Sequence, residues 1–278
     1  MKQAASRHIG DFKVTVLDDG NMSASLELLM GIDPHEAGKI QQRAGINEPG
    51  NIHINAYLIE HKGKKILVDT GTGGRNAIGG ELQQSLCAAG VSPEEIDVVL
   101  LTHAHPDHVG GLLDAEDRRV FPRAQLYLHP LEAQYWQDDE KYQQASERAQ
   151  RNFLLARRVL SAYESNLHYL EDGLLIEGIR PVWLPGHTPG HTGFRIDAEG
   201  KSLLIWGDIV HFPHIQSIQP TVSIVFDCDP AQAEATRQHI LAQAVEGSMI
   251  VAGMHLGVEG FARVIAVEDG YRLLYSEE

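Results

Sequence analysis

A short run rich in histidine offers several metal ligands directly after a hydrophobic segment. Residues 103–108 read His-Ala-His-Pro-Asp-His, and they follow the run 98–102, Val-Val-Leu-Leu-Thr, which is typical of a buried strand. Alternate side chains of a strand point to the same face. We therefore expect His103 and His105 to converge on one point.

The second half of this run brings two more ligand types. Pro106 prevents a regular helix through His105, and the turn that follows directs Asp107 and His108 from another side. Imidazole nitrogens and a carboxylate oxygen suit zinc, iron or manganese better than calcium or magnesium. The position behind a buried strand favours a metal site over an exposed histidine-rich loop.

Three later segments place ligand-type residues in the same setting, at the end of a predicted strand and beside glycine. They are Pro185-Gly186-His187-Thr188-Pro189-Gly190-His191, Trp206-Gly207-Asp208 and Gly253-Met254-His255. Each segment alone is a weak signal, because a lone histidine after a strand usually makes a hydrogen bond within its loop. Together with the first run, they predict a centre assembled at one edge of a rigid sheet.

Hydrophobic periodicity and turn residues predict the elements that position these segments. Strands are expected over Phe12–Leu17, Ile52–Ile59, Lys65–Val68, 98–102, Ala124–Leu128, Leu174–Ile176, Pro181–Leu184, Thr192–Ile196, Ser202–Trp206, Met249–Met254, Ala262–Val267 and Tyr271–Tyr275. Helices are expected over Ile78–Ala89, over 130–163 as one or two helices, and over 230–246. Residues 21–50 are expected to form a long loop with some helix. Strands and helices alternate but hairpins are frequent, so we expect two mixed sheets with helices outside, in a single domain spanning 1–278.

The composition excludes several function classes. The chain has 278 residues, 43% of them hydrophobic, and a formal charge of −15, which argues against binding nucleic acid or an anionic membrane. Cys87 and Cys228 are far apart and form no CxxC pattern, so we expect two small buried residues rather than a disulfide or a thiolate zinc site. Neither a signal-peptide core nor an apolar run of transmembrane length is present, and the cytoplasm is the expected location.

The ordered motifs HAHPDH, PGHTPGH, GD and a late strand followed by histidine resemble those of the metallo-β-lactamase superfamily. Asp69 in Val68-Asp69-Thr70-Gly71 also matches a supporting aspartate of that family, so the resemblance covers residues 69–255. Residues 10–20, 206–211 and 252–264 look closest to the methyl parathion hydrolase branch, which is related to the N-acyl homoserine lactonases. The resemblance implies an α+β fold, an αββα sandwich of two mixed sheets between helices, with the metals at one edge.

The same resemblance implies a dinuclear site with divided ligands. It assigns His103, His105 and His187 to one metal, Asp107, His108 and His255 to the other, and Asp208 to a bridging position. His191 becomes a supporting or packing residue. Asp69 either orients a ligand imidazole or caps the turn at Thr70-Gly71. The expected cofactors are two divalent metal ions, zinc first, with manganese, cobalt or iron as alternatives.

Two such metals can share a water, lower its pKa towards neutrality and hold a hydroxide nucleophile for hydrolysis without a covalent intermediate. The candidate catalytic residues are Asp107, Asp208 and His211. In the homoserine lactonases a tyrosine occupies the position of His211, which argues against a specific homoserine-lactone assignment. His211 and nearby His214 either assist by hydrogen bonding or simply pack or lie in an exposed loop.

The expected function is therefore hydrolysis of a small neutral ester, lactone or phosphotriester. Trp136, Tyr135, Phe153, Trp183 and Phe212 are candidate pocket walls, although aromatic residues are often simply core. The alternatives are an iron-dependent enzyme similar to the sulfur dioxygenases, or a thioester hydrolase similar to glyoxalase II. The expected partner is a small-molecule substrate, and residues 21–50 and 130–163 are candidates for a homodimer contact or a substrate lid.

Overall fold

Two β-sheets form the centre of the molecule. The computed structural model describes residues 4–171, 173 and 176–275. The first sheet contains, in order of pairing, β1 (Ser6–Ile9), β2 (Phe12–Ser23), β4 (Asn51–His61), β5 (Lys64–Val68), β6 (Val98–Leu100), β7 (Gln125–Leu128) and β8 (Leu167–Tyr169). The second contains, in order of pairing, β15 (Gly270–Leu274), β14 (Phe261–Val267), β13 (Ile250–Ala252), β11 (Lys201–Ile205), β10 (Thr192–Ala198) and β9 (Arg180–Trp183). A separate short pair joins β3 (Leu29–Met30) to β12 (Ser223–Ile224).

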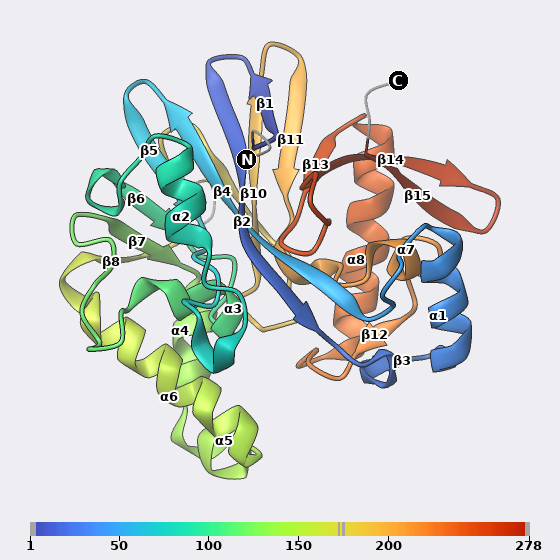
Figure 1. The fold of residues 1–278 in the computed structure, drawn as a ribbon, viewed down its shortest axis with the longest axis horizontal. Helices are drawn as coiled ribbons and strands as arrows, with labels where there is room; N and C mark the ends of the chain where they lie inside the picture. The colour runs from blue at the N-terminus through green and yellow to red at the C-terminus, as the bar shows by residue number, and fades with distance from the viewer. Residues whose placement is uncertain (1–3, 172, 174–175, 276–278) are drawn as a thin grey trace.

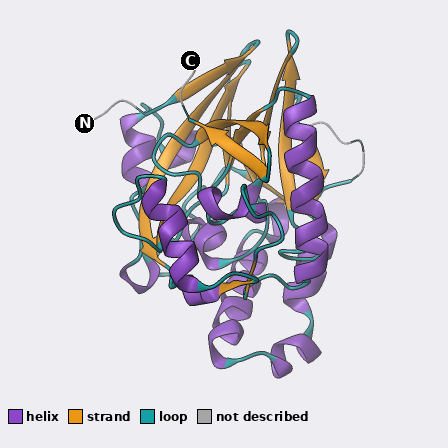
Figure 2. Cartoon of the chain, turned by 90° about the vertical axis from the view of Figure 1, so that its right-hand side faces the viewer, coloured by secondary structure: helices purple, strands orange, loops and turns teal. Residues whose placement is uncertain are grey.

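Helices cover the outer faces of these sheets (Figures 1 and 2). The α-helices are α1 (Pro34–Arg43), α2 (Leu82–Ala88), α3 (Pro106–Val109), α4 (Pro130–Gln137), α5 (Asp139–Gln144), α6 (Glu147–Ala162), α7 (Pro213–Gln216) and α8 (Pro230–Glu246). Short 3-10 helices are η1 (Leu26–Leu28), η2 (Arg75–Ala77), η3 (Pro93–Glu95), η4 (Gly110–Leu112), η5 (Glu164–Asn166) and η6 (Gly207–Ile209). Helix α5 and the adjoining end of α6 project below the body of the molecule in Figure 1.

Three hydrophobic clusters hold these layers together. Between the sheets, buried side chains of β2 and β4 pack against those of β10 and β11, including Ile59 and Phe194. Outside the first sheet, α2 and α6 bury Leu86 and Phe153. Outside the second sheet, α8 buries Leu241 against β11 and β13. This helix–sheet–sheet–helix order confirms the predicted αββα fold, because each sheet buries both of its faces.

The strand ends place the predicted ligand segments at one edge of the sandwich. Strands β5 to β8 run parallel, as do β11 and β13, so their carboxyl ends lie at the same edge. His103 follows β6, Asp208 follows β11 and His255 follows β13. His187 lies in the loop between β9 and β10. Segments that are distant in sequence therefore meet at the lower edge of the sheets in Figure 1.

The predicted helices differ from the observed ones in two places. Residues 130–163 form three helices rather than one or two, because Asp138 and Ser146 each adopt extended backbone and cap a new helix. The helix expected from Ile78 begins only at Leu82, after the glycine pair 79–80, which has positive φ. The expected loop at residues 21–50 contains α1 and β3 and also includes the end of β2.

The sequence pattern did not predict several short strands. Strands β1, β3, β8 and β12 were not predicted, and β2 continues to Ser23, well past Leu17. Of the strand expected at 174–176, residues 174 and 175 lie outside the described residues, and Ile176 forms an isolated bridge to Ile179.

Two further predictions from composition, on the cysteines and on membrane-spanning segments, can be compared with the structure. Cys87 and Cys228 are free, as expected, but both are exposed rather than buried. Among the described residues, no helix is long and apolar enough to cross a membrane.

Candidate metal centre

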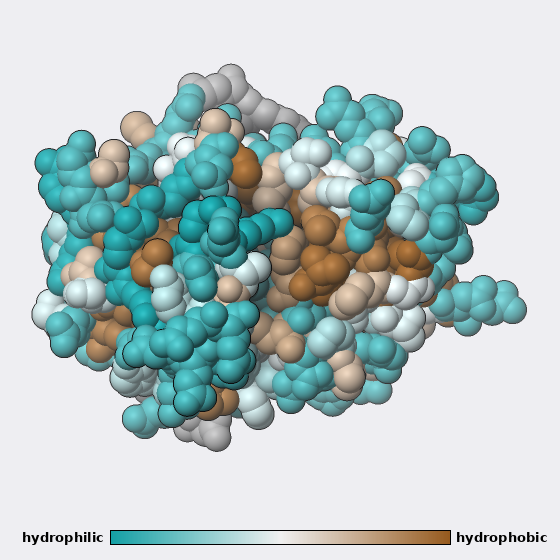
Figure 3. All heavy atoms as spheres, turned by 90° about the horizontal axis from the view of Figure 1, so that it is seen from below, coloured by the Kyte–Doolittle hydropathy of each residue, from teal (hydrophilic) through white to brown (hydrophobic). Residues whose placement is uncertain are grey.

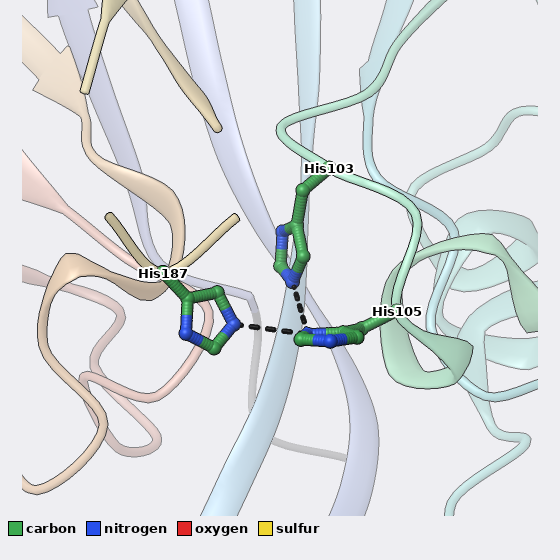
Figure 4. A group of neighbouring side chains, drawn as sticks. All are labelled: His103, His105 and His187. Carbon is green, nitrogen blue, oxygen red and sulfur yellow. Dashed lines mark hydrogen bonds between the residues drawn. The ribbon is translucent and has the colours of Figure 1, made fainter. Parts of the chain in front are cut away.

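Three histidines from two distant loops direct ring nitrogens to one point (Figure 4). His103 Nε2 lies 2.9 Å from His105 Nδ1, which in turn lies 2.9 Å from His187 Nε2. Burial lowers the pKa of His103 and of His105 well below the usual value for histidine, so both rings are neutral near pH 7. Neutral imidazoles offer lone pairs, which is the form that binds a metal. We call these three residues the first cluster.

A second group lies beside the first. One ligand atom from each of Asp107, His108, Asp208 and His255 lies within 4.8 Å of the others. Asp107 and His108 stand on α3, which begins at Pro106 with His105 as its N-cap residue, so the proline redirects the chain as the sequence predicted. We call Asp107, His108 and His255 the second cluster.

Asp208 lies between the two clusters. Its Oδ2 is 3.1 Å from His108 Nε2 and 3.3 Å from His255 Nε2, and it is 3.8 Å from His103 Nε2 and 3.7 Å from His187 Nε2. Its Oδ1 is buried with no hydrogen-bond partner among the described residues. Burial opposes ionisation, but the surrounding histidines, His108 first, hold the pKa of Asp208 well below its usual value. An ionised carboxylate with a free buried oxygen between two ligand groups suits a position shared by two cations.

The second cluster is partly open to solvent. The Asp107 side chain is 19% exposed, whereas those of His108 and His255 are fully buried. Burial lowers the pKa of His108, but Asp208, Asp107 and Asp69 more than offset this effect and raise the pKa well above the usual value. A metal ion binding at His108 must therefore displace a proton.

Asp69 fixes the orientation of two candidate ligands. Its Oδ2 accepts hydrogen bonds from His108 Nδ1 at 2.7 Å and from Thr102 Oγ1 at 2.6 Å. Because Thr102 Oγ1 donates to Asp69, it accepts from His103 Nδ1 at 3.0 Å. Both Nε2 atoms are thereby left facing the centre. Of the two roles considered for Asp69, orienting a ligand imidazole is the one that these contacts support.

Other supporting groups hold the remaining candidates. His187 Nδ1 donates to Asp227 Oδ1 at 2.8 Å, and His255 Nδ1 donates to the backbone oxygen of His53 at 2.7 Å. His191 donates from Nδ1 to the backbone oxygen of Leu184, and its Nε2 accepts from the backbone N–H of Asp208 at 2.9 Å. His191 is thus a supporting residue that fixes the backbone of Asp208.

Asp227 was missed by sequence reasoning, and it belongs to a larger buried arrangement. Arg237 of α8 is fully buried, and its Nη2 lies 3.7 Å from Asp227 Oδ2. The same guanidinium donates to the backbone oxygens of Ile209, Pro220 and Val222. Arg237 therefore contacts both Ile209, which directly follows Asp208, and Asp227, which orients His187.

His211 lies inside the centre rather than in an exposed loop. Its Nε2 is 3.1 Å from Asp208 Oδ2, and its ring stacks on that of His255 with the centroids 5.3 Å apart. Its Nδ1 is buried without a partner in the described chain. His214 is placed differently: its ring lies 5.7 Å from the ring of Tyr275. It belongs to none of the candidate metal groups formed by the described residues.

The candidate aromatic walls divide between the site and the core. The Trp136 ring meets the His105 ring edge-on at 5.4 Å, and Phe153 packs on Trp136. Tyr135 and Phe153 line a cavity of about 540 Å³. This cavity is also lined by Gly186 and Pro189, which lie in the same loop as His187. Phe212 is buried in a separate hydrophobic cluster. Trp183 is 51% exposed and stacks on His129.

The order and geometry of these groups agree with a family match. Residues 49–255 match the metallo-beta-lactamase superfamily, and this segment includes every candidate ligand. The chain belongs to the metallo-beta-lactamase superfamily.

Solved structures share the metallo-beta-lactamase fold over the whole chain. A crystal structure of the hydrolase AbOPH has a TM-score of 0.92 and 27% identity, covering 100% of this chain and 99% of the other. The dizinc quorum-quenching lactonase AidC, in complex with the product N-hexanoyl-L-homoserine, has a TM-score of 0.91 and 24% identity, with the same coverage. Because the identity to AidC is only 24%, this similarity shows the fold alone.

A curated relative shares part of the sequence. Hydroxyacylglutathione hydrolase of Aeromonas hydrophila is 28% identical over 191 residues, which are 67% of this chain and 55% of that enzyme. The match therefore spans little more than half the length of that enzyme. Membership in the superfamily, with its hydrolase neighbours, supports a metal-dependent hydrolase.

Proposed function

We propose that this protein is a dinuclear metal-dependent hydrolase of a small neutral ester, lactone or phosphotriester, in the branch of methyl parathion hydrolase and the N-acyl homoserine lactonases. The observation that carries the proposal is the position of Asp208 Oδ2, within 3.8 Å of nitrogen atoms from both clusters. The nitrogen and carboxylate donors fit zinc, manganese, cobalt or iron, with zinc expected first. The similarity to AbOPH over the full length supports a hydrolytic reaction.

Each cluster has a proposed role. His103, His105 and His187 would hold one metal ion, Asp107, His108 and His255 a second, and Asp208 both. Two divalent ions bound there would supply an activated water and a Lewis acid for hydrolysis. Ionised Asp208 would offset the repulsion between two such cations. Asp107 contributes a second carboxylate beside the solvent-exposed side of the centre.

His211 is proposed to contact the substrate. Its ring faces the centre, because Nε2 lies 3.1 Å from Asp208 Oδ2. With its ring proton on Nε2, the atom that faces the centre, it would donate a hydrogen bond that orients the carbonyl or phosphoryl oxygen, or stabilises the departing oxygen as the bond breaks. The tyrosine of the homoserine lactonases occupies this position, so we propose that His211 replaces it.

An apolar surface beside the centre favours a neutral substrate. Partly exposed hydrophobic side chains surround η1, β3 and β12, including Leu28, Ile32 and Phe226, and Val225 is 47% exposed. Figure 3 shows hydrophobic surface on the underside of the molecule, the side where β3 and β12 lie in Figure 1. Phe226 directly precedes Asp227, the partner of His187, so the chain leads directly from this surface to the first cluster. Apolar walls with a few directed polar groups are typical of small-molecule sites.

The alternative is a thioester hydrolase similar to glyoxalase II or an iron-dependent enzyme similar to the sulfur dioxygenases. The match to hydroxyacylglutathione hydrolase favours the first of these over the second. Several points stay predictions: a small-molecule substrate, no binding of nucleic acid or membrane, a possible homodimer, a cytoplasmic location and a single domain over 1–278.

The test combines metal analysis with a substrate panel. Protein purified without added metal is expected to carry about two divalent ions per chain and to hydrolyse a lactone, an aryl ester or a phosphotriester. Asp208→Ala is expected to lose both turnover and tightly bound metal. Asp269→Ala, the same change in an exposed turn, is expected to lose neither. Exclusive thioester hydrolysis, a single iron with oxygen uptake, or an Asp208→Ala variant with full metal and turnover would contradict the proposal.

A further inference from the structure

One fully buried carboxylate has no part in the chemistry proposed above. Glu132 lies in the first turn of α4 and is completely buried. A buried carboxylate is costly unless its oxygens accept hydrogen bonds. Here Oε1 accepts from the backbone N–H of Ala104 at 3.0 Å and from Trp136 Nε1 at 2.6 Å. Oε2 accepts from Thr188 Oγ1 at 2.7 Å and from the backbone N–H of Gly190 at 3.1 Å.

Three of these four donors belong to the two loops that carry the first cluster, and the fourth, Trp136, lies on α4 itself. Ala104 stands between His103 and His105, and Thr188 directly follows His187. A single side chain therefore joins loops that are more than eighty residues apart in sequence, since His105 and His187 are 82 positions apart. The Trp136 donor also packs its ring edge-on against His105.

The packing around Glu132 leaves little freedom for these loops to move. A Cβ atom added at Gly190 would lie 2.4 Å from the backbone nitrogen of Glu132, so the loop lies directly on the start of α4. The backbone N–H groups of Ala104 and Gly190 are buried in this contact, and the carboxylate is their acceptor. Removing that acceptor would favour displacement of both loops, because an unpaired buried N–H is unfavourable.

We propose that Glu132 is a positioning residue that sets the spacing between the two loops of the first cluster and so determines the affinity of that cluster for its metal. The second cluster has different supports, Asp69 for His108 and the His53 backbone for His255. Loss of Glu132 should therefore affect the two metal positions unequally. This inference depends on the dinuclear centre of the proposed function but not on its substrate.

The test is the variant Glu132→Gln, assayed by metal content rather than by activity. Glutamine keeps the size of the side chain, but its NH₂ group must face two of the four donors. We expect the affinity for one metal to fall about 10- to 100-fold, as for other groups that support metal ligands. After dialysis against graded chelator, elemental analysis should find one metal per chain where the wild type keeps two. Glu140→Gln, the same change at an exposed site on α5, should keep two.

A double variant identifies which metal is lost. His255→Ala removes a candidate ligand of the second cluster. If Glu132 supports the first cluster, Glu132→Gln combined with His255→Ala retains no tightly bound metal. Retention of one metal in the double variant would overturn the proposal, since both changes would then act on the same position. A lower melting temperature with two metals still bound at equal affinity would overturn it too, because Glu132 would then be only structural.

A milder pair of variants covers the case in which Glu132→Gln does not fold. Thr188→Val removes one donor and leaves the carboxylate in place, whereas Thr188→Ser retains the hydroxyl. We expect Thr188→Val to weaken the same metal to a smaller extent and Thr188→Ser to bind as the wild type does. Equal metal affinities in the two variants would contradict the proposal. A wild type that binds no metal pair would instead refute the proposed function.

Discussion

Replacing Asp69 by asparagine is expected to weaken metal binding while leaving the fold intact. Asp69 has a left-handed backbone conformation with φ of 58°, which asparagine tolerates better than most residues. The aspartate has three acceptor contacts, to Thr102 N–H, Thr102 Oγ1 and His108 Nδ1. The amide has only one oxygen, so it cannot satisfy all three.

Either orientation of the asparagine amide disturbs the site. If its oxygen serves His108 and the Thr102 hydroxyl, its NH₂ faces the buried N–H of Thr102, and an unmet donor of this kind costs about 1–3 kcal/mol. If its oxygen serves the Thr102 N–H, its NH₂ faces His108 Nδ1. The one ring proton that His108 keeps in its neutral, metal-binding form then lies on Nε2, the atom that faces Asp208, and the lone pair for the metal is lost.

Metal affinity should fall about 10- to 100-fold, which is the usual effect of removing a group that orients a ligand. This factor corresponds to about 1.4–2.8 kcal/mol. Competition with a chelator of known affinity measures the change, and circular dichroism checks the fold. Asp117→Asn is the matched control, because Asp117 is exposed and also has a positive φ of 57°. Equal metal affinities in Asp69→Asn, Asp117→Asn and the wild type would refute the reasoning about the His108 proton.

Two more predictions concern residues around Asp208. His211→Phe should keep the metal content and lower kcat about 100-fold, because it removes one donor aimed at the centre. His214→Phe should leave kcat unchanged, because its ring lies beside Tyr275 instead. Steady-state kinetics with parallel metal analysis measures both, and equal kcat values in the two variants would exclude a role for His211. Arg237→Met should lower the free energy of unfolding by about 3–5 kcal/mol, because it leaves Asp227 and three backbone oxygens without the guanidinium. Urea denaturation measures this change. As the control, Arg118→Met at an exposed site should lower the free energy of unfolding by less than about 1 kcal/mol. Similar losses in the two variants would show that the buried contacts of Arg237 contribute little.

The candidate ligands could be predicted because their signals are local. His103, Asp208 and His255 each follow a hydrophobic strand, and such strands are recognisable from a few consecutive residues. Pro106 also marks the change of direction that separates the first two histidines from Asp107. Two mixed sheets with helices outside followed from the same strands and from the hairpins between them, and the family resemblance implied the αββα order.

The supporting residues could not be predicted, because their partners are distant in sequence. Glu132 accepts from Thr188 and Gly190, 56 and 58 positions away, and it stands in a helix whose other residues give no hint of a buried acid. Asp227 is separated from His187 by 40 positions. The short strands β1 and β8 were missed for a related reason: three or four residues carry little pattern, and tertiary pairing decides their conformation.

The helical region 130–163 is a different case, because its signals were present in the sequence. Asp138 and Ser146 are typical N-cap residues, and each starts a new helix where the polar stretch suggested continuity. Reading these two residues as caps would have predicted the three observed helices.

The distribution of the candidate ligands over two sheets has a consequence for folding. His103, His105 and His108 follow a strand of the first sheet, whereas Asp208 and His255 follow strands of the second. Neither sheet alone contains a complete cluster, since the first cluster needs His187 and the second cluster needs His255, and both come from the second sheet. High-affinity metal uptake must therefore come after the two sheets have docked, and ions added to a refolding chain would report the last step of assembly. The bound ions would also cross-link the two sheets at the edge where the hydrophobic core ends.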